Sequence, residues 1–246
     1  ISFTEALQHF QSTELSESRE KVRAPARRGI LAALFHCLRG SPRLRPQLRG
    51  EQELVLAMAQ RALDDSERVH MRILQTIYRQ LTCSRLGCPR YGAHWEQLGF
   101  QGRRGSTPLP REIPIPKIQL NLPWSNSVLS QFPQPLPELQ TQLHCPLLTM
   151  LQYFNNFPFC IMSVNITRMV IQALREERLS RECNRRQQVI GVLNDLYAAA
   201  FLQLFRLWKG QHGTIADAGF FLKELELSTK KKPRQLLKSL EAYMSR

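Results

Sequence analysis

Cysteine and histidine are the side chains of this sequence best suited to nucleophilic catalysis or metal binding. No two cysteines form a C-x-x-C pair, and no Cys/His group follows the spacing of a zinc site. We therefore expect reduced thiols that mostly fill the core of a cytosolic protein, with no metal and no cofactor. The residues concerned are Cys37, Cys83, Cys88, Cys145, Cys160 and Cys183, with His9, His36, His70, His94, His144 and His212.

The sequence motifs of nucleotide-binding and hydrolytic enzymes are missing. The chain contains no G-x-x-x-x-G-K-[ST], G-x-G-x-x-G, H-E-x-x-H or G-x-S-x-G. Its carboxylates are spread along the predicted helices without forming an obvious acid/base couple. The sequence therefore gives no sign of an enzyme with its own substrate chemistry.

Positive charge is concentrated near the two ends of the chain. The formal net charge is +14 over 246 residues, and residues 19–49 and 230–246 carry almost all of it. Basic ends attract nucleic acid, anionic membrane or an acidic partner, although a solvated surface has the same composition. Few aromatic residues are interleaved with the basic ones, which argues against nucleic acid. No run of 18 apolar residues predicts a membrane-spanning helix.

Helical periodicity dominates the sequence and predicts an all-α fold. No stretch of six or more residues alternates with period two. Asp64, Asp65 and Ser66 offer N-cap side chains to the third predicted helix. The apolar stripe of the helix predicted over residues 185–209 is so wide that we place this helix at the centre of the core. The predicted helices cover residues 29–38, 51–63, 69–81, 160–179, 185–209, 215–228 and 233–244.

A proline-rich segment interrupts the helices. Nine of the 15 prolines lie within residues 103–146, and a proline inside a helix costs about 3 kcal/mol. We expect residues 103–150 to form an irregular insert. Within it, Pro133–Pro137 could form a polyproline II ligand, although such short matches are common by chance.

Several blocks of sequence resemble the ELMO domain family. The resemblance covers residues 1–102 and about 154–246 and implies a single helical ELMO-type domain. It divides the chain into a basic N-terminal helical flank (1–50), the ELMO domain (51–210, interrupted by 103–150) and C-terminal helices (211–246). The blocks are Val69–Tyr78, Tyr91–Gly102, Gln172–Glu177, Ile1–Phe10, Phe157–Thr167, Leu179–Arg185 and Gly219–Glu226.

This resemblance implies a GTPase-activating protein for Arf or Arf-like small GTPases. Such an activator needs no cofactor, because the GTPase supplies nucleotide, Mg²⁺ and water. The activator supplies an arginine that neutralises charge on the transferring phosphate, which is worth about 10³–10⁵ in rate. The residues that the resemblance assigns to GTPase binding are Trp95, Gly99, Phe100, Gln101 and Gly102.

The arginine of the family motif is replaced in this chain. Its aligned position holds Pro110, and the nearest candidate for the catalytic arginine is Arg111, one residue later and followed by Glu112. We expect GTPase activation to be weak or inactive in this form. We also hypothesise that residues 103 to about 150 arise from alternative splicing or a mispredicted exon.

Two other interpretations stay open at this point. The chain could be a non-catalytic interaction module that binds a small GTPase, the cytoskeleton or anionic lipid through its basic ends, with Lys230–Lys232 as the lipid contact. It could also fold poorly, because replacing an internal helix with a polar loop removes several buried side chains at about 1.5–3 kcal/mol each. The expected location is cytoplasmic, with association with the cytoskeleton as an option.

Overall fold

The computed structural model describes residues 1–12, 42–60, 64, 66–82, 84, 86–89, 92, 94 and 159–245. These residues form helices and connecting segments without a strand, which confirms the predicted all-α class. The α-helices are α1 (Phe3–Ser12), α4 (Arg49–Met58), α5 (Arg68–Thr82), α8 (Phe159–Arg175), α9 (Ser180–Arg186), α10 (Ile190–Gly210), α11 (Ala218–Lys231) and α12 (Pro233–Met244). Two 3₁₀ turns, η1 (Pro46–Leu48) and η4 (Ile215–Asp217), precede α4 and α11.

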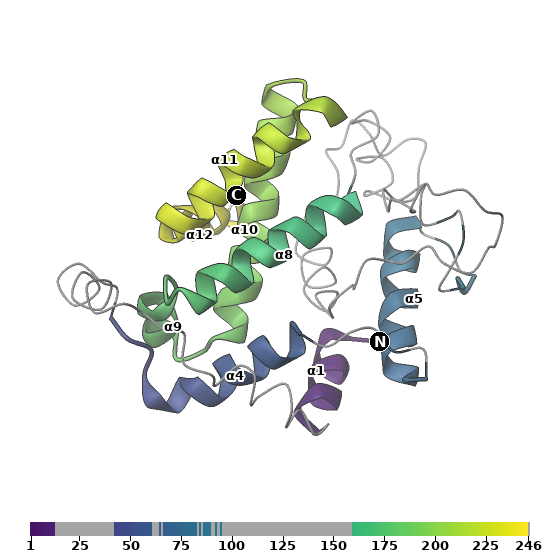
Figure 1. Ribbon diagram of the computed structural model, residues 1–246, viewed down its shortest axis with the longest axis horizontal. Helices are drawn as coiled ribbons and strands as arrows, with labels where there is room; N and C mark the ends of the chain where they lie inside the picture. The colour runs from purple at the N-terminus through teal and green to yellow at the C-terminus, as the bar shows by residue number, and fades with distance from the viewer. Residues whose placement is uncertain are drawn as a thin grey trace.

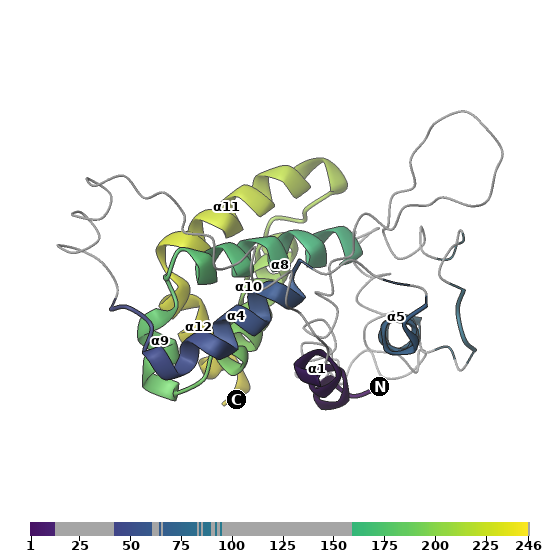
Figure 2. The same cartoon turned by 60° about the horizontal axis from the view of Figure 1, so that its bottom comes forward.

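Helix α10 is the centre of the core, as its wide apolar stripe predicted. The consecutive residues Leu196–Leu202 are all buried, so this helix turns every side toward protein. Helices α8, α11 and α12 pack against it, with α4 and α9 at its N-terminal half. Figure 1 shows these helices gathered in one bundle, and the turned view of Figure 2 keeps α8, α10 and α11 side by side.

Length and composition would also allow α10 to cross a membrane. Its most apolar 18-residue window is, however, 67% buried inside the protein. A helix that is apolar on all sides suits either the middle of a bundle or a lipid bilayer. The surrounding helices satisfy the first requirement, so α10 is the core helix of the bundle.

Helices α1 and α5 meet through an aromatic contact at the other end of the structure. Phe10 is fully buried and stacks on the His70 ring at 5.7 Å between centroids. The His70 Nδ1 atom accepts a hydrogen bond from the Asp64 backbone N–H at 3.0 Å. The Asp64 carboxylate in turn accepts a hydrogen bond from the Ser66 N–H at 2.9 Å. Asp64 and Ser66, which were predicted to cap the helix, instead form the turn that precedes it. Helix α5 begins at Arg68.

The boundary between the fourth and fifth predicted helices differs in the structure. Helix α8 ends at Arg175 and α10 begins at Ile190, whereas the predicted helices end at 179 and begin at 185. The short helix α9 lies between them and was not predicted. Gln187 ends α9 in the left-handed conformation (φ 56°, ψ 33°). Glycine is the usual residue there, so a glutamine gives no stop signal in the sequence.

The N-terminus of α10 is held by a residue from a distant helix. The Glu51 carboxylate on α4 accepts hydrogen bonds from the backbone N–H groups of Val189 and Ile190, at 2.9 and 2.8 Å. The first N–H groups of a helix have no partner within the helix, and their partial positive charge favours an acidic group. Glu51 thus caps α10 and fixes α4 against the bundle in one contact.

Three predictions concern residues outside the described part of the chain. They are the helix at 29–38, the irregular insert at 103–150 with its Pro133–Pro137 segment, and the basic residues 19–39 of the N-terminal end. Helices α11 and α12 contribute Phe221, Leu225, Leu236 and Leu237 to the same core as α10.

We expect the chain to unfold in one cooperative thermal transition, followed by circular dichroism, because its helices share one buried core. Leu196→Ala should reduce the free energy of unfolding by about 2–5 kcal/mol, since Leu196 is fully buried on α10. Leu227→Ala, at a side chain that is 46% exposed on α11, should change it by no more than about 0.5 kcal/mol. A gradual melt, or equal effects of the two substitutions, would contradict the packing of this core.

Candidate functional site

The residues assigned to GTPase binding and catalysis lie outside the described part of the chain. These are Trp95, Gly99, Phe100, Gln101, Gly102, Pro110 and Arg111. The structure therefore neither brings them together nor separates them. It does show His94, which directly precedes the Trp95–Gly102 motif, and the polar groups that the described helices bring together.

His94, the residue immediately before Trp95, is held against α5. Its Nε2 atom is 3.0 Å from the Pro89 carbonyl oxygen, so this nitrogen carries the proton that makes the hydrogen bond. The Tyr78 ring meets the His94 ring edge-on at 5.3 Å between centroids. Gly92 has φ 146°, and a Cβ atom there would lie 2.7 Å from the imidazole. The positive φ favours glycine at this position, and any larger residue would also displace the His94 ring.

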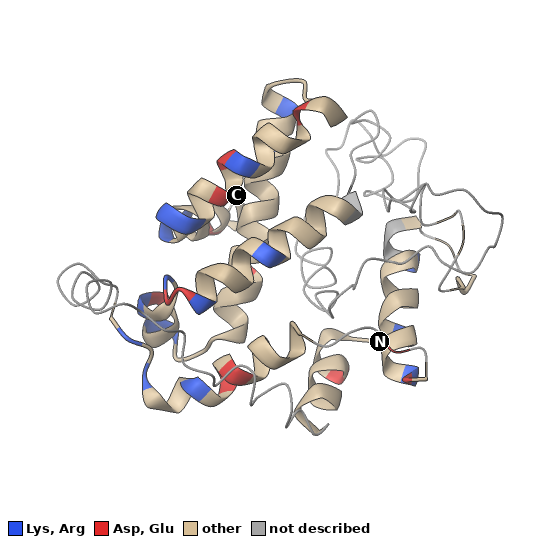
Figure 3. Ribbon diagram, in the orientation of Figure 1, with Lys and Arg blue, Asp and Glu red and all other residues tan. Residues whose placement is uncertain are grey.

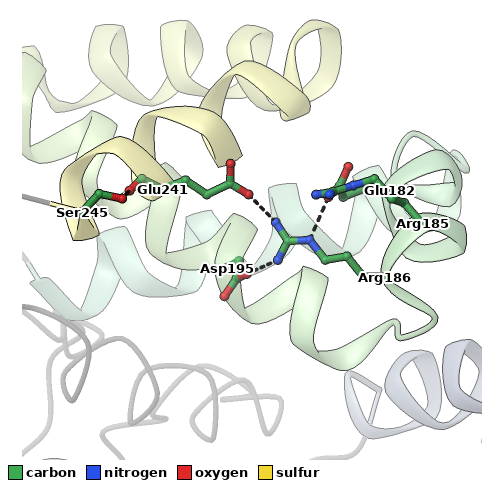
Figure 4. Close-up of polar contacts among 6 residues, drawn as sticks. All are labelled: Glu182, Arg185, Arg186, Asp195, Glu241 and Ser245. Carbon is green, nitrogen blue, oxygen red and sulfur yellow. Dashed lines mark hydrogen bonds and ion pairs between the residues drawn. The ribbon is translucent and has the colours of Figure 1, made fainter.

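Arg186 is the centre of the largest group of charged contacts in the described residues (Figure 4). Its guanidinium bonds the carboxylates of Glu182 on α9, Asp195 on α10 and Glu241 on α12, at 2.7, 2.5 and 2.8 Å. Arg185 also donates to Glu182. One side chain thereby joins three helices, in the fork geometry that arginine offers to carboxylates. We call Glu182, Arg185, Arg186, Asp195 and Glu241 the Arg186 cluster.

The charges of the Arg186 cluster nearly cancel. Burial raises the pKa of the Glu182 carboxyl, but hydrogen bonds from Arg185 and Arg186 outweigh this and leave its pKa below the usual value of 4.5. The Arg186 side chain is 18% exposed and already occupied by three carboxylates. A guanidinium held in this way cannot also reach a phosphate on a partner. Arg186 therefore positions helices and is excluded as an alternative catalytic arginine.

The described cysteines are unreactive in character. Cys88 and Cys183 are buried free thiols. Burial raises the pKa of Cys88, and burial with the nearby Glu51 and Glu182 carboxylates raises the pKa of Cys183 to about 12. For these two residues the predicted role as reduced core filler is confirmed. Among the described residues, no group of three or more His, Cys, Asp or Glu side chains could hold a metal ion.

Lys230–Lys232, the predicted lipid contact, lie where α11 ends and α12 begins (Figure 3). Lys230 Nζ is 3.6 Å from the Glu176 carboxylate at the end of α8. Lys231 and Lys232 are exposed. The triplet is thus partly a helix-packing contact and partly available surface.

Sequence reasoning missed Glu51 and the Arg186 cluster. The spacing of Glu182 and Arg186, four residues apart, is a recognisable helical ion pair. The contacts with Asp195 and Glu241, and the Glu51 cap 138 residues away, have no local signal. They depend on which helices the core brings together.

The sequence model of the ELMO/CED-12 family matches residues 53–109 and 133–222. These two segments contain more than half of the chain. The chain belongs to the ELMO/CED-12 family. The family inferred from the sequence blocks is thereby confirmed. The match also includes residues 103–109 and 133–153, which the predicted resemblance had left out.

Similar members of the ELMO/CED-12 family come from mammals. The chain is 48% identical to ELMO domain-containing protein 3 of Bos taurus over 245 residues, and 48% identical to that of Homo sapiens over 246 residues. The Mus musculus protein is 47% identical over 245 residues. Each alignment covers 100% of this chain, which spans 62% of the length of these curated relatives. No solved structure matches the chain.

The ELMO/CED-12 match is interrupted where the resemblance predicts the catalytic arginine. It stops at residue 109 and resumes at residue 133. Pro110, which the resemblance predicts at the position of the family arginine, and Arg111 both lie in this unmatched stretch. The Trp95–Gly102 motif lies inside the matched part.

Cys183 should resist alkylation in the folded protein. With a pKa of about 12, its thiolate fraction at pH 7 is on the order of 10⁻⁵. We expect iodoacetamide to label the Cys183 peptide slowly under native conditions and rapidly in guanidinium chloride, as measured by peptide mass spectrometry. Equal rates in the two conditions would show that this thiol is not buried.

The Arg186 cluster should make the free energy of unfolding depend on pH in the acidic range. The folded-state pKa of Glu182 is lowered, so its contribution is complete above about pH 4.5 and is lost as the pH falls through the folded-state pKa. Glu182→Gln should cost roughly 3 kcal/mol at pH 7, because it removes the buried carboxylate that pairs with the mostly buried Arg186 guanidinium. The difference from the unmodified protein should shrink below pH 4.5.

Glu241→Gln is the matched control for this measurement, because Glu241 contacts the same guanidinium but its side chain is 55% exposed. Its cost should be at most about 1 kcal/mol. Urea unfolding curves between pH 3 and 7 measure both variants. A larger effect at Glu241 than at Glu182 would contradict the proposed role of the buried carboxylate.

Proposed function

We propose that this chain acts on an Arf or Arf-like small GTPase as a GTPase-activating protein, in the cytoplasm. The observation that carries the proposal is the ELMO/CED-12 match, which includes the Trp95–Gly102 motif. In this proposal Trp95, Gly99, Phe100, Gln101 and Gly102 contact the GTPase. The GTPase supplies nucleotide, Mg²⁺ and the attacking water, so the activator needs no cofactor.

The proposed activity is weak or absent in this form. A GTPase activator of this type works by placing a guanidinium beside the transferring phosphate. The family match breaks off at residue 109, directly before Pro110 and Arg111. Arg186 supplies no replacement, since its guanidinium is occupied by three carboxylates. The proposal assigns any stimulation to Arg111, the arginine nearest to the aligned position of the family arginine.

The alternative is a non-catalytic interaction module. The interrupted motif favours this alternative, because GTPase binding through Trp95–Gly102 does not require the arginine. Contacts with the cytoskeleton or with anionic lipid through the basic ends belong to the same alternative. The exposed Lys231 and Lys232 support it at the C-terminal end.

Single-turnover GTP hydrolysis by Arf and Arf-like GTPases tests the proposal. We expect the chain to raise the rate far less than the 10³–10⁵-fold of a complete arginine finger. Whatever stimulation is present should be lost in both Arg111→Ala and Arg111→Lys, because a lysine cannot reproduce the planar fork of the guanidinium. Arg103→Ala is the control and should retain the stimulation.

Binding measured in the same reactions separates the alternatives. GTP-dependent binding with no rate increase would identify the non-catalytic module and refute GTPase activation. Stimulation that survives Arg111→Ala would show that another residue acts on the phosphate. Absence of both binding and stimulation would refute any role on these GTPases.

A further inference from the structure

Helix α11 has an outer face of unusual composition. Five large hydrophobic side chains are well exposed in the described part of the chain, and Phe220 and Leu227 on α11 are two of them, at 61% and 46% exposure. A third, Ile215, lies in η4 directly before the helix and is 55% exposed. Scattered single apolar residues are ordinary on a protein surface, whereas a group on one element marks a contact site.

The spacing of these residues puts them on one side of α11. Phe221, Leu225 and Thr229 are buried and define its inner side. At ~100° per residue, Phe220 and Leu227 project from nearly the opposite direction. Lys223, Lys230 and Lys231 lie within the same outer sector. We define the α11 outer face as Phe220, Lys223, Leu227, Lys230 and Lys231.

Acidic residues lie at the borders of this face. Glu224 and Glu226 fall on opposite flanks of the helix, where Glu224 is half-buried. Lys232 and Arg234, both exposed, extend the positive charge beyond the end of α11 (Figure 3). Among the described residues, Lys230 is the only lysine of the outer face with an ion pair, to Glu176. The outer face is therefore apolar and cationic together.

We infer that the α11 outer face docks onto an anionic membrane surface. Exposed phenylalanine and leucine flanked by lysines suit the lipid interface, because the apolar side chains can enter it while the flexible lysines reach the headgroups. Its charge complements acidic headgroups, with about 1 kcal/mol per Lys near the surface. Phe220 and Leu227 would enter the boundary between headgroups and acyl chains, while the buried side of α11 stays packed on α8 and α10. This inference does not depend on GTPase activation.

Vesicle binding tests the charge of the face. The probes are vesicles of phosphatidylcholine alone and of phosphatidylcholine with phosphatidylserine, with the full chain sedimented at low and at physiological salt. We expect binding only to the anionic vesicles. Lys223→Gln with Lys231→Gln should weaken partitioning about 30-fold, at about 1 kcal/mol per charge. Arg68→Gln with Arg79→Gln removes the same charge from exposed sites on α5 and should change binding less than about threefold.

A second pair of variants tests the apolar part of the face. Phe220→Ser with Leu227→Ser should weaken binding to anionic vesicles by at least about tenfold. Leu86→Ser with Met244→Ser, at exposed hydrophobic residues elsewhere, should leave it unchanged. Phe220→Trp should add a tryptophan emission that shifts to the blue on vesicle binding, and Met244→Trp should not. Circular dichroism should be the same for all variants, because every substituted side chain is exposed.

Three outcomes would overturn the inference. Equal losses of vesicle binding in the Lys223/Lys231 and Arg68/Arg79 double variants would mean that net charge alone attracts the chain to the vesicles. Unchanged binding in the Phe220/Leu227 pair, or no shift for the tryptophan at position 220, would mean that the face does not enter lipid. Failure to bind vesicles, with Lys223-dependent binding to polyglutamate instead, would identify the face as a site for an acidic protein.

Discussion

Helix α10 sets the constraint that the rest of the structure satisfies. Its residues 196–202 are buried on every side, so it is stable in water only when other helices cover it completely. Helices α8, α11 and α12 supply that cover, with α4 and α9 at its N-terminal half. A helix covered in this way allows little freedom in the placement of its neighbours, because cores are close-packed. The apolar residues of α11 and α12 therefore belong to the same core, although these helices lie at the end of the chain.

Polar contacts fix the direction in which the covering helices pack. Glu51 caps α10 from α4, and Arg186 joins α9, α10 and α12 through three carboxylates. Arg206 adds a hydrogen bond to Ser239 at 2.6 Å and lies over the Tyr243 ring at 5.7 Å. Each of these contacts links groups that apolar packing alone would leave free to slide. Charged groups at the border of this core thus serve architecture, and none of them resembles a catalytic arrangement.

The two proposed binding features of this ELMO/CED-12 member involve separate sets of residues. The motif that we connect with a GTPase follows His94, which Tyr78 and Pro89 hold beside α5. The α11 outer face lies on the helical bundle. The opposite side of α11 is buried in the core. The proposed lipid-binding face and the proposed GTPase-binding motif involve different residues, so the two proposals are compatible. In our proposal the interrupted arginine position limits GTPase activation, whereas neither kind of binding requires this arginine.

The sequence by itself determined the helical class, the central place of α10 and the family, because periodicity and ordered blocks of residues are local properties of the chain. It also singled out Pro110 and Arg111, whose structural setting lies outside the described residues. The sequence-based prediction misplaced the helix ends around α9. Gln187 adopts a left-handed conformation there, and a glutamine does not predict this conformation. Only the tertiary structure decided that Glu51 caps a helix 138 residues away, that Arg186 is occupied by carboxylates, and that Phe220 and Leu227 face outward. The physical reason is that burial and ion pairing depend on which helices meet, and that is settled when the apolar surface of α10 is covered.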